Sequence, residues 1–441
     1  MATSLPPGPR GSLRGLVAYL RDPIHCMVPF THEYGDPFSL PGKPPVVFTG
    51  EPANIQAIYS ADPDTFEPLG QDVGDLIGRR VLLLLSGSEH RRARKLMGPS
   101  FQGPRMRAYS DGMVAAARKH SDGWRVGQTV SLLETAQHIS LDVIIQAIFG
   151  VSDPERMAQL ATLLLDITNG INPLLALFPA LRREFGGVGP FASFQRRRQR
   201  LWSVLDELIA ARRASANPPQ DVLGLLLQAR DDDGQPLSDA DLRDQLVLMT
   251  FAGHETTAIA ISWAFHALHQ RENAAVLERL RTELDAVGAG ATPAELAGLP
   301  YLEAVVQETL RRYPLAPAPS PRRLLRPLNL GGYELPAGIG VAAGIGIVHF
   351  NEKVYPEPLR FRPERFLERQ YSPFEFIPFG GGARRCLGAS MATHEMKLVI
   401  VTLLRRFRLR LASTRVDPGA VRAANVGPKY GVKMVVEERR E

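Results

Sequence analysis

The most constraining feature of the sequence is a long apolar stretch near its middle. Leu246 to Leu268 spans 23 residues with a single carboxylate, Glu255. That length suits a membrane span, but an acid at the bilayer centre costs about 2.5–3.5 kcal/mol, and no second span follows. The apolar pattern starts at Ser238, which resembles an N-cap, and runs to about Gln270. It predicts a buried helix of about 32 residues, roughly 48 Å long, which only a large domain can cover.

The composition is that of an ordinary globular protein. The chain has 441 residues, 44% of them hydrophobic and 22% charged, so it can bury a sizeable core. The net charge of +6 is mild, and the basic run from Gln195 to Arg200 lacks interleaved aromatic residues, so neither indicates nucleic-acid binding. Two cysteines, Cys26 and Cys386, exclude a disulfide framework and a four-thiolate metal site. The first residues contain no signal-peptide core or membrane anchor, so we expect a soluble, cytoplasmic protein.

No internal repeat and no Gly/Ser linker divides the sequence, which predicts one domain over residues 1–441. The segment 314–378 holds 11 of the 36 prolines, so we expect it to be mostly extended or looped. Turn residues and hydrophobic periodicity predict strands within 37–49 and 328–348, and helices over about 88–97, 298–312 and 386–404.

A glycine-rich loop with one thiol follows the proline-rich segment. It reads Phe379-Gly-Gly-Gly-Ala-Arg-Arg-Cys-Leu-Gly388, and Cys386 comes where a helix is expected to begin. A helix N-terminus favours the thiolate and offers N–H groups to the sulfur, while glycines let the backbone approach a flat ligand. The loop lacks the Lys-Ser/Thr ending of a phosphate-binding loop. A catalytic nucleophile and a buried structural cysteine are the alternatives, although arginines rather than a base are adjacent.

Four motifs in order resemble those of the cytochrome P-450 family. The loop matches the haem-binding pattern Phe379-Gly380-x-Gly382-x-Arg384-x-Cys386-x-Gly388. The motifs before it are Ala252-Gly-His-Glu-Thr-Thr257, Glu308-Thr-Leu-Arg311 and Phe361-Arg-Pro-Glu-Arg-Phe366. The last two are weak alone, because a Glu and an Arg three residues apart on a helix usually form a solvated pair. By the four together the chain is identified as a member of this family, which implies a mainly α-helical haem-thiolate fold with small β-sheets.

The resemblance implies that Cys386 is the proximal thiolate ligand of the iron in haem b (iron protoporphyrin IX). It also assigns Phe379, Gly380, Arg384 and Gly388 to the cofactor-binding loop. In this class of haem protein the thiolate favours cleavage of the O–O bond.

A second implication of the resemblance is a buried charge cluster behind the haem. Glu308 and Arg311 resemble the helix pair that Arg365 joins there. The expected role is structural, because losing one member of such a network leaves an unpaired buried charge.

The resemblance places Ala252 and Gly253 of the central helix on the opposite side of the haem, where small residues leave room for the cofactor. Glu255 and Thr256 resemble the acid–alcohol pair that delivers protons during oxygen activation, and they are the expected catalytic residues. Outside this context, a threonine bonded to its own helix is the ordinary interpretation of Thr256. His254 fills the variable position of the motif, and we assign it no catalytic role.

The two haem propionates need cationic partners. His90 and Arg94 are four residues apart, share a helix face and resemble the family's propionate-binding helix. Arg384 and Arg322 are the other expected partners by resemblance, with Arg323 as the alternative to Arg322. A surface role is the alternative for any one arginine of this arginine-rich chain.

The resemblance implies a monooxygenase that inserts one atom of O2 into a hydrophobic small molecule by hydroxylation or epoxidation. Terpenoids, fatty acids, steroids and macrolide-like scaffolds all suit such a site. No flavin or iron–sulfur segment follows the loop, so electrons are expected from a separate ferredoxin and its reductase; no nucleic acid and no membrane anchor are expected. A rearranging or peroxide-using enzyme, which would not need Glu255 and Thr256, and a non-catalytic haem sensor are the alternatives. By family position the pocket is expected from 69–85, 170–190, 248–256, 316–321 and 425–427.

Overall fold

The computed structural model describes residues 5–70, 74–101, 108–170, 175, 181–183, 186–215, 221–317, 319–422 and 425–440. The chain divides into two compact units, which are described separately. The prediction of one domain over residues 1–441 stays a prediction. Unit 1 combines Met1–Leu69, Met113–Gln137 and Thr256–Glu441, and unit 2 combines Gly70–Gly112 and His138–Glu255. The 30-residue helix α13 (Asp239–Leu268) contributes to both units.

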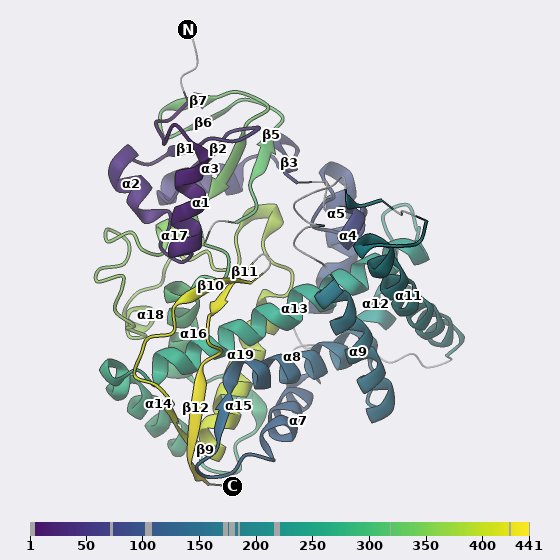
Figure 1. Cartoon of the computed structure of the whole chain (residues 1–441), viewed down its shortest axis with the longest axis vertical. Helices are drawn as coiled ribbons and strands as arrows, with labels where there is room; N and C mark the ends of the chain where they lie inside the picture. The colour runs from purple at the N-terminus through teal and green to yellow at the C-terminus, as the bar shows by residue number, and fades with distance from the viewer. Residues whose placement is uncertain are drawn as a thin grey trace. The chain divides into compact units, whose positions relative to one another are not determined.

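The described strands lie in unit 1 (Figure 1). The largest sheet has the order β1-β2-β8-β5-β3, in which β2 and β8 run parallel and the other neighbours antiparallel. A three-stranded sheet has the order β4-β12-β9, and β6-β7 and β10-β11 are hairpins. The strands are β1 (Phe38–Leu40), β2 (Val46–Thr49), β3 (Phe66–Pro68), β4 (Thr129–Ser131), β5 (Arg322–Leu324), β6 (Leu328–Leu330), β7 (Tyr333–Leu335), β8 (Gly340–Ala343), β9 (Phe407–Leu411), β10 (Gly419–Arg422), β11 (Asn425–Pro428) and β12 (Lys433–Arg439).

The helices of unit 1 pack against these sheets and against one another. Val47 and Val341 pair across β2 and β8 and share an apolar cluster with Ile58 of α3. The helices are α1 (Ser12–Arg21), α2 (Val28–Tyr34), α3 (Pro52–Ser60), α7 (Ser110–Ser121), α14 (Ala274–Ala286), α15 (Pro293–Ala297), α16 (Pro300–Arg312), α17 (Ile345–Val348), α18 (Arg365–Glu368) and α19 (Ala389–Arg406).

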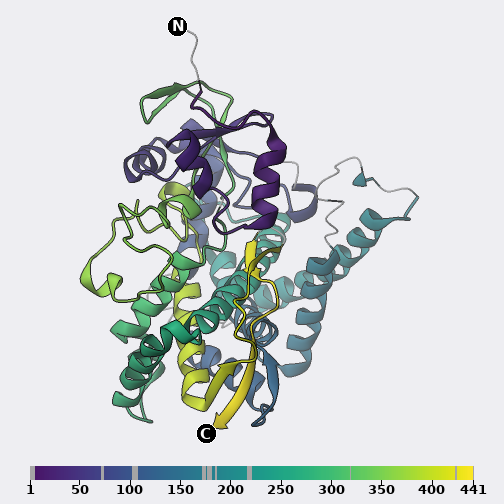
Figure 2. The same cartoon turned by 60° about the vertical axis from the view of Figure 1, so that its left-hand side comes forward.

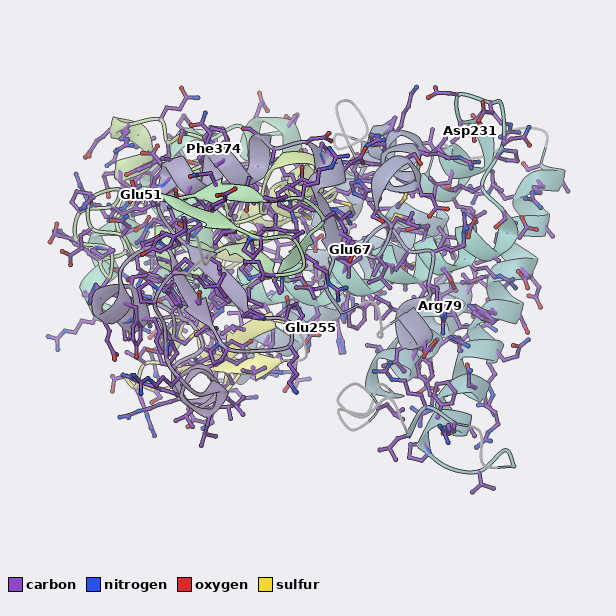
Figure 3. The ribbon with its side chains drawn as sticks, turned by 90° about the horizontal axis from the view of Figure 1, so that it is seen from above. Glu51, Glu67, Arg79, Asp231, Glu255 and Phe374 are labelled. Carbon is purple, nitrogen blue, oxygen red and sulfur yellow. The ribbon has the colours of Figure 1, made fainter. Side chains whose placement is uncertain are left out.

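Unit 2 is helical throughout its described part. Its elements are α4 (Gly74–Ile77), α5 (Gly87–Met97), most of α8 (Leu132–Phe149), α9 (Pro154–Gly170), α11 (Pro190–Ala214), α12 (Val222–Gln228) and the first part of α13. Ion pairs tie the loop before α13 to α5: Arg92 contacts Asp231 at 2.6 Å, and Lys95 contacts Asp232. Asp231 is labelled in Figure 3.

The central helix predicted from the apolar stretch is confirmed as α13. Ser238 caps it, since its hydroxyl accepts the N–H of Asp241 at 3.1 Å, and two aspartates in the first turn suit the helix dipole. Within unit 1 the helix is buried, and Trp263 stacks on Tyr313 with ring centroids 4.5 Å apart. Among the described helices, none combines the length and the apolar character that crossing a bilayer requires.

Two predicted elements differ from the structure. The strands predicted within 328–348 end at Ala343, because the chain turns into α17 where Gly344 and Gly346 lie close to Ile347 and Pro317. The helix predicted from Cys386 begins at Ala389 instead. The reason is local: the N–H of Cys386 donates to the Phe379 carbonyl at 2.9 Å and so closes the loop before the helix starts.

Candidate functional site

The thiol of Cys386 is exposed at the end of a tightly folded loop. Gly380 and Gly382 have φ angles of +65° and +60°, which side chains rarely adopt. The Cys386 N–H is bonded to the Phe379 carbonyl, and Gly388 lies at the N-cap of the 18-residue helix α19. The sulfur is therefore presented to a ligand beside a helix N-terminus, which favours the thiolate.

Tyr59, which the sequence did not indicate, forms the floor of this loop. A Cβ atom at Gly381 would lie 2.2 Å from the Tyr59 ring, and one at Gly382 would lie 2.5 Å from the Tyr59 carbonyl oxygen. The ring comes from α3, and burial raises the pKa of its hydroxyl to about 12. The contact with α3 therefore leaves no room for a side chain at Gly381 or Gly382, and the loop packs directly against this helix.

Arg322 lies on β5 and shares the Tyr59 ring with the loop. Its guanidinium carbon is 5.6 Å from the ring centroids of both Tyr59 and Phe66. Burial lowers the pKa of this guanidinium, and no carboxylate pairs with it within the described ranges. Arg323 instead is exposed and contacts Glu67 of β3, which is labelled in Figure 3, at 3.3 Å. Of the two arginines that the sequence left open, Arg322 is the one whose charge still needs an anion.

The contrast between Arg322 and Arg323 predicts that Arg322 is the one that binds a haem propionate. Arg322→Ala is expected to speed haem loss about tenfold or more, because a hydrogen bond to a charged group contributes about 1.5–3 kcal/mol. Arg323→Ala is the matched control and should leave the rate unchanged. Capture of released haem by excess apomyoglobin measures both rates, and equal rates for the two variants would contradict the assignment.

The charge cluster implied by the motifs is fully buried behind the loop in unit 1. Glu308 accepts from Nε and Nη2 of Arg311 at 2.7 and 2.9 Å. It also accepts from Nε of Arg365 at 3.1 Å and from the backbone N–H of Arg362 at 2.8 Å. The three charged side chains are at most 2% exposed. Nη1 of Arg311 donates to the His349 carbonyl, and Nη1 of Arg365 donates to the Pro356 carbonyl. Because these carbonyls accept further guanidinium N–H groups, a single carboxylate can stabilise both buried cations.

His349 connects this cluster to the cysteine loop, a role for which the sequence carries no signal. Its carbonyl accepts from Nη1 of Arg311 at 2.8 Å, and its Nε2 accepts the N–H of Ile377 at 3.1 Å. The Ile377 carbonyl in turn accepts the N–H of Gly380 at 2.9 Å. Burial lowers the pKa of the imidazole to about 3, so Nε2 keeps its lone pair at neutral pH. A continuous hydrogen-bonded path therefore runs from Glu308 to the loop.

His349→Leu is expected to weaken the path, because it leaves the buried Ile377 N–H without its acceptor, at a cost of about 1–3 kcal/mol. Part of the reduced, carbon monoxide-bound protein should then lose the red-shifted Soret band of a thiolate haem. His349→Gln, which offers a carbonyl oxygen near the position of Nε2, should restore it. If leucine leaves both the band and the unfolding midpoint unchanged, His349 has no positioning role.

The helix predicted over 88–97 is α5 of unit 2. As the residue spacing predicts, it has one more buried face and one exposed face. His90 is 4% exposed and Arg94 is half-buried on the same side, whereas Arg91, Arg92 and Lys95 are exposed. The structure thus places the two predicted propionate partners together on one helix. Whether they bind a propionate stays a prediction.

The small residues of α13 have different surroundings. Ala252 is exposed, but a Cβ atom at Gly253 would lie 2.9 Å from Cδ1 of Ile144 on α8. Close packing against α8 is therefore one constraint on Gly253. That Ala252 and Gly253 leave room for the cofactor stays a prediction. Glu255 (Figure 3) and Thr256 follow on the same helix, and both are half-buried.

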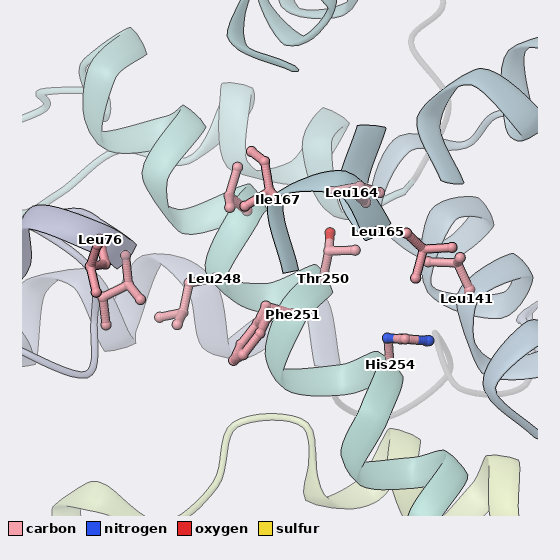
Figure 4. A pocket seen from close by; sticks show the side chains of 11 residues that line it. Leu76, Leu141, Leu164, Leu165, Ile167, Leu248, Thr250, Phe251 and His254 are labelled. Atoms are coloured by element: carbon pink, nitrogen blue, oxygen red, sulfur yellow. The ribbon is translucent and has the colours of Figure 1, made fainter. Parts of the chain in front are cut away.

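A small, mostly apolar cleft that is partly open to solvent lies within unit 2. Thr250 and His254, one turn apart on α13, project to one side of the helix among leucines of α8 and α9 (Figure 4). Of the segments expected to form the substrate pocket, 69–85 and 248–256 contribute to this cleft. Helices α8 and α9 also line it, although the sequence did not suggest them. Most of the expected segment 170–190 lies outside the described residues. The lining is completed by Leu76, Ile77, Leu141, Leu164, Leu165, Ile167, Val247, Leu248 and Phe251.

These residues fit an iron porphyrin. An exposed thiol at a helix N-terminus suits a metal that binds thiolate. Arg322 provides a cation without a carboxylate partner in the described chain, as a propionate requires. The predicted loop residues Phe379, Gly380, Arg384, Cys386 and Gly388 come together in unit 1.

Comparisons with known proteins agree with this geometry. The family model described as Cytochrome P450 matches residues 6–426. A protein of Mycobacterium tuberculosis (strain ATCC 25618 / H37Rv) assigned as cytochrome P450 135A1 is 34% identical over 460 residues, covering 100% of this chain and 97% of the relative. The structure of a retinoic acid-bound cyanobacterial CYP120A1 matches with a TM-score of 0.81 and 28% identity, covering 98% and 99% of the two chains. The cytochrome P450DA haem domain shares the fold, with a TM-score of 0.84, 22% identity and coverage of 99% and 98%.

Proposed function

Because the chain belongs to the cytochrome P450 family of haem-binding monooxygenases, we propose that it inserts one atom of dioxygen into an apolar small molecule, by hydroxylation or epoxidation. The observation that carries this proposal is the exposed thiol of Cys386 in its glycine loop. When bound, the haem supplies the redox-active iron that activates dioxygen. Cys386 would ligate the iron, and Arg322, His90, Arg94 and Arg384 would hold the propionates.

An apolar substrate is supported by the cleft in unit 2, where leucines and isoleucines predominate. A structure similar to this chain has retinoic acid bound, which is an apolar molecule with one carboxylate. Terpenoids, fatty acids, steroids and macrolide-like compounds are therefore the first candidates. Compounds that shift the Soret band of the ferric protein identify ligands, and labelled dioxygen then tests the reaction. One labelled oxygen atom in the product supports the proposal, and unlabelled product contradicts it.

We assign proton delivery to Glu255 and Thr256, which are adjacent on α13. Thr256→Ala is expected to keep haem and ligand binding but to divert reducing equivalents, because dioxygen is no longer cleaved productively. The hydrogen peroxide released per NAD(P)H oxidised should rise severalfold, a change that corresponds to about 1 kcal/mol in the competing barriers. Thr257→Ala, at the neighbouring buried position, is the control. An unchanged ratio for Thr256→Ala would favour a rearranging or peroxide-using enzyme.

We propose a ferredoxin and its reductase as the electron donors. Arg385, exposed beside Cys386, is a cation that suits an acidic partner. Arg92 and Lys95 of α5 form ion pairs with Asp231 and Asp232, so they are less available to such a partner.

A further inference from the structure

The helix α1 packs against the rest of unit 1 through Gly15, Ala18 and Tyr19. Gly15 lies in van der Waals range of Leu40, since a Cβ atom there would be 3.9 Å from the leucine methyls. Ala18 and Tyr19 lie against the apolar cluster that contains Cys26 and Phe30. These contacts hold α1 against the rest of unit 1 without help from its large aliphatic side chains.

The opposite face of α1 is a stripe of large aliphatic side chains. Leu13, Leu16, Val17 and Leu20 are 70%, 54%, 53% and 64% exposed. Their spacing of three, four and seven residues places them on one side of the helix. The helix therefore exposes its four large aliphatic residues, whereas Gly15, Ala18 and Tyr19 are half-buried. This is the reverse of what burial of aliphatic area favours. Single exposed leucines are common on protein surfaces, but a contiguous apolar stripe indicates a site that binds another protein or a membrane.

Arginines border this stripe, which we call the α1 stripe. The backbone of α1 is labelled in Figure 1 and is seen turned by 60° in Figure 2. Arg14 and Arg21 are seven residues apart and so lie on the same side of the helix, and Arg10 precedes it. Between Leu5 and Arg21 the sequence contains no acid. Arg14 contacts Glu33 at 2.6 Å, whereas Arg10 and Arg21 have no carboxylate partner among the residues that the structure describes. Asp22 directly follows Arg21 and contacts His25 at 3.0 Å. It lowers the net charge at that end of the helix, but the exposed guanidinium groups of Arg10 and Arg21 remain available to an anionic surface.

We propose that the α1 stripe docks this protein on an anionic lipid surface. A single convex helix offers no groove for a partner chain, whereas a helix with aliphatic residues on one side and arginines along its border can lie in the plane of a bilayer interface. The leucines would enter the boundary between headgroups and acyl chains, and Arg10 and Arg21 would contact headgroup phosphates. This attachment is separate from the proposed reaction and needs no membrane span.

Vesicle sedimentation of the haem-loaded protein tests the proposal. The native protein should bind vesicles of phosphatidylcholine and phosphatidylglycerol in equal parts more tightly than pure phosphatidylcholine, and added salt should weaken this preference. Arg21→Gln should lower the affinity for the mixed vesicles about fivefold, and combining Leu16→Gln with Leu20→Gln should lower it at least tenfold, since about two leucines no longer enter the lipid. Leu359→Gln changes a leucine that is 63% exposed elsewhere in unit 1 and is the matched control.

Equal affinity of the native protein and the double variant for the mixed vesicles would overturn the proposal, as would an absence of binding. A self-associated native protein that the double variant dissociates would make the α1 stripe a contact between two copies. A lower thermal unfolding midpoint of the double variant, without vesicle binding by the native protein, would make it an internal packing face. The carbon monoxide spectrum of each variant shows that the haem site is unaffected, so failure here leaves the proposed reaction untouched.

Discussion

Replacing Cys386 with alanine is expected to yield a chain that binds haem weakly or not at all. The thiolate is the ligand that the loop is built to present, and the exposed sulfur has no substitute, because the second cysteine is buried elsewhere in unit 1. Haem content per chain after reconstitution should fall by about tenfold or more, as loss of a charged contact of about 1.5–3 kcal/mol already gives. Cys386→His should retain haem but lose the thiolate spectrum.

Cys26→Ala is the matched control for this prediction. The Cys26 thiol is 4% exposed and donates to the Pro23 carbonyl at 3.5 Å. Burial raises its pKa to about 12, so it does not ionise at neutral pH. Its replacement should change neither haem content nor spectrum. A haem content that falls with Cys26→Ala and persists with Cys386→Ala would reverse the assignment.

Glu308→Ala is expected to be the most destabilising substitution in the part of unit 1 that surrounds the loop. It leaves Arg311 and Arg365 buried without their carboxylate, and breaking a buried pair in this way costs about 3–5 kcal/mol. The midpoint of denaturant unfolding should fall markedly. Because the path through His349 starts at Glu308, the remaining folded protein should also hold the cysteine loop less firmly and lose haem faster.

Glu303→Gln on the same helix provides the comparison. Glu303 is partly exposed and contacts Lys397 at 2.6 Å, so its loss should cost about 0–1 kcal/mol, as for other surface pairs. The account predicts a clear separation between the two variants. Equal unfolding midpoints would mean that the Glu308 cluster is not what stabilises this region.

Periodicity and capping were enough to predict the helices that matter most. Ser238 and the apolar run after it located α13, and the predicted range 298–312 ends where α16 ends, at Arg312. The four motifs identified the family. The role of the loop residues in binding haem stays a prediction. Local turns were harder, since the start of α19 depends on a hydrogen bond that only the folded loop forms.

Other site features depend on contacts between residues distant in the sequence. Tyr59 of α3 contacts the loop although the two are more than 300 positions apart in the sequence. His349 acts through two hydrogen bonds, which its carbonyl accepts from Arg311 and its Nε2 accepts from the Ile377 N–H. Neither leaves a pattern in the sequence. The α1 stripe is visible as a helical period, but periodicity alone does not say which face is buried. The choice between Arg322 and Arg323 likewise needed the position of Glu67.

The central claim is that Cys386 holds the haem iron as a thiolate, and the carbon monoxide difference spectrum of the reduced native protein tests it most directly. The account predicts the strongly red-shifted Soret band of a thiolate haem, present in Cys26→Ala and absent in Cys386→Ala and Cys386→His. An unshifted band in the native protein, or a red-shifted band that survives in Cys386→Ala, would contradict it.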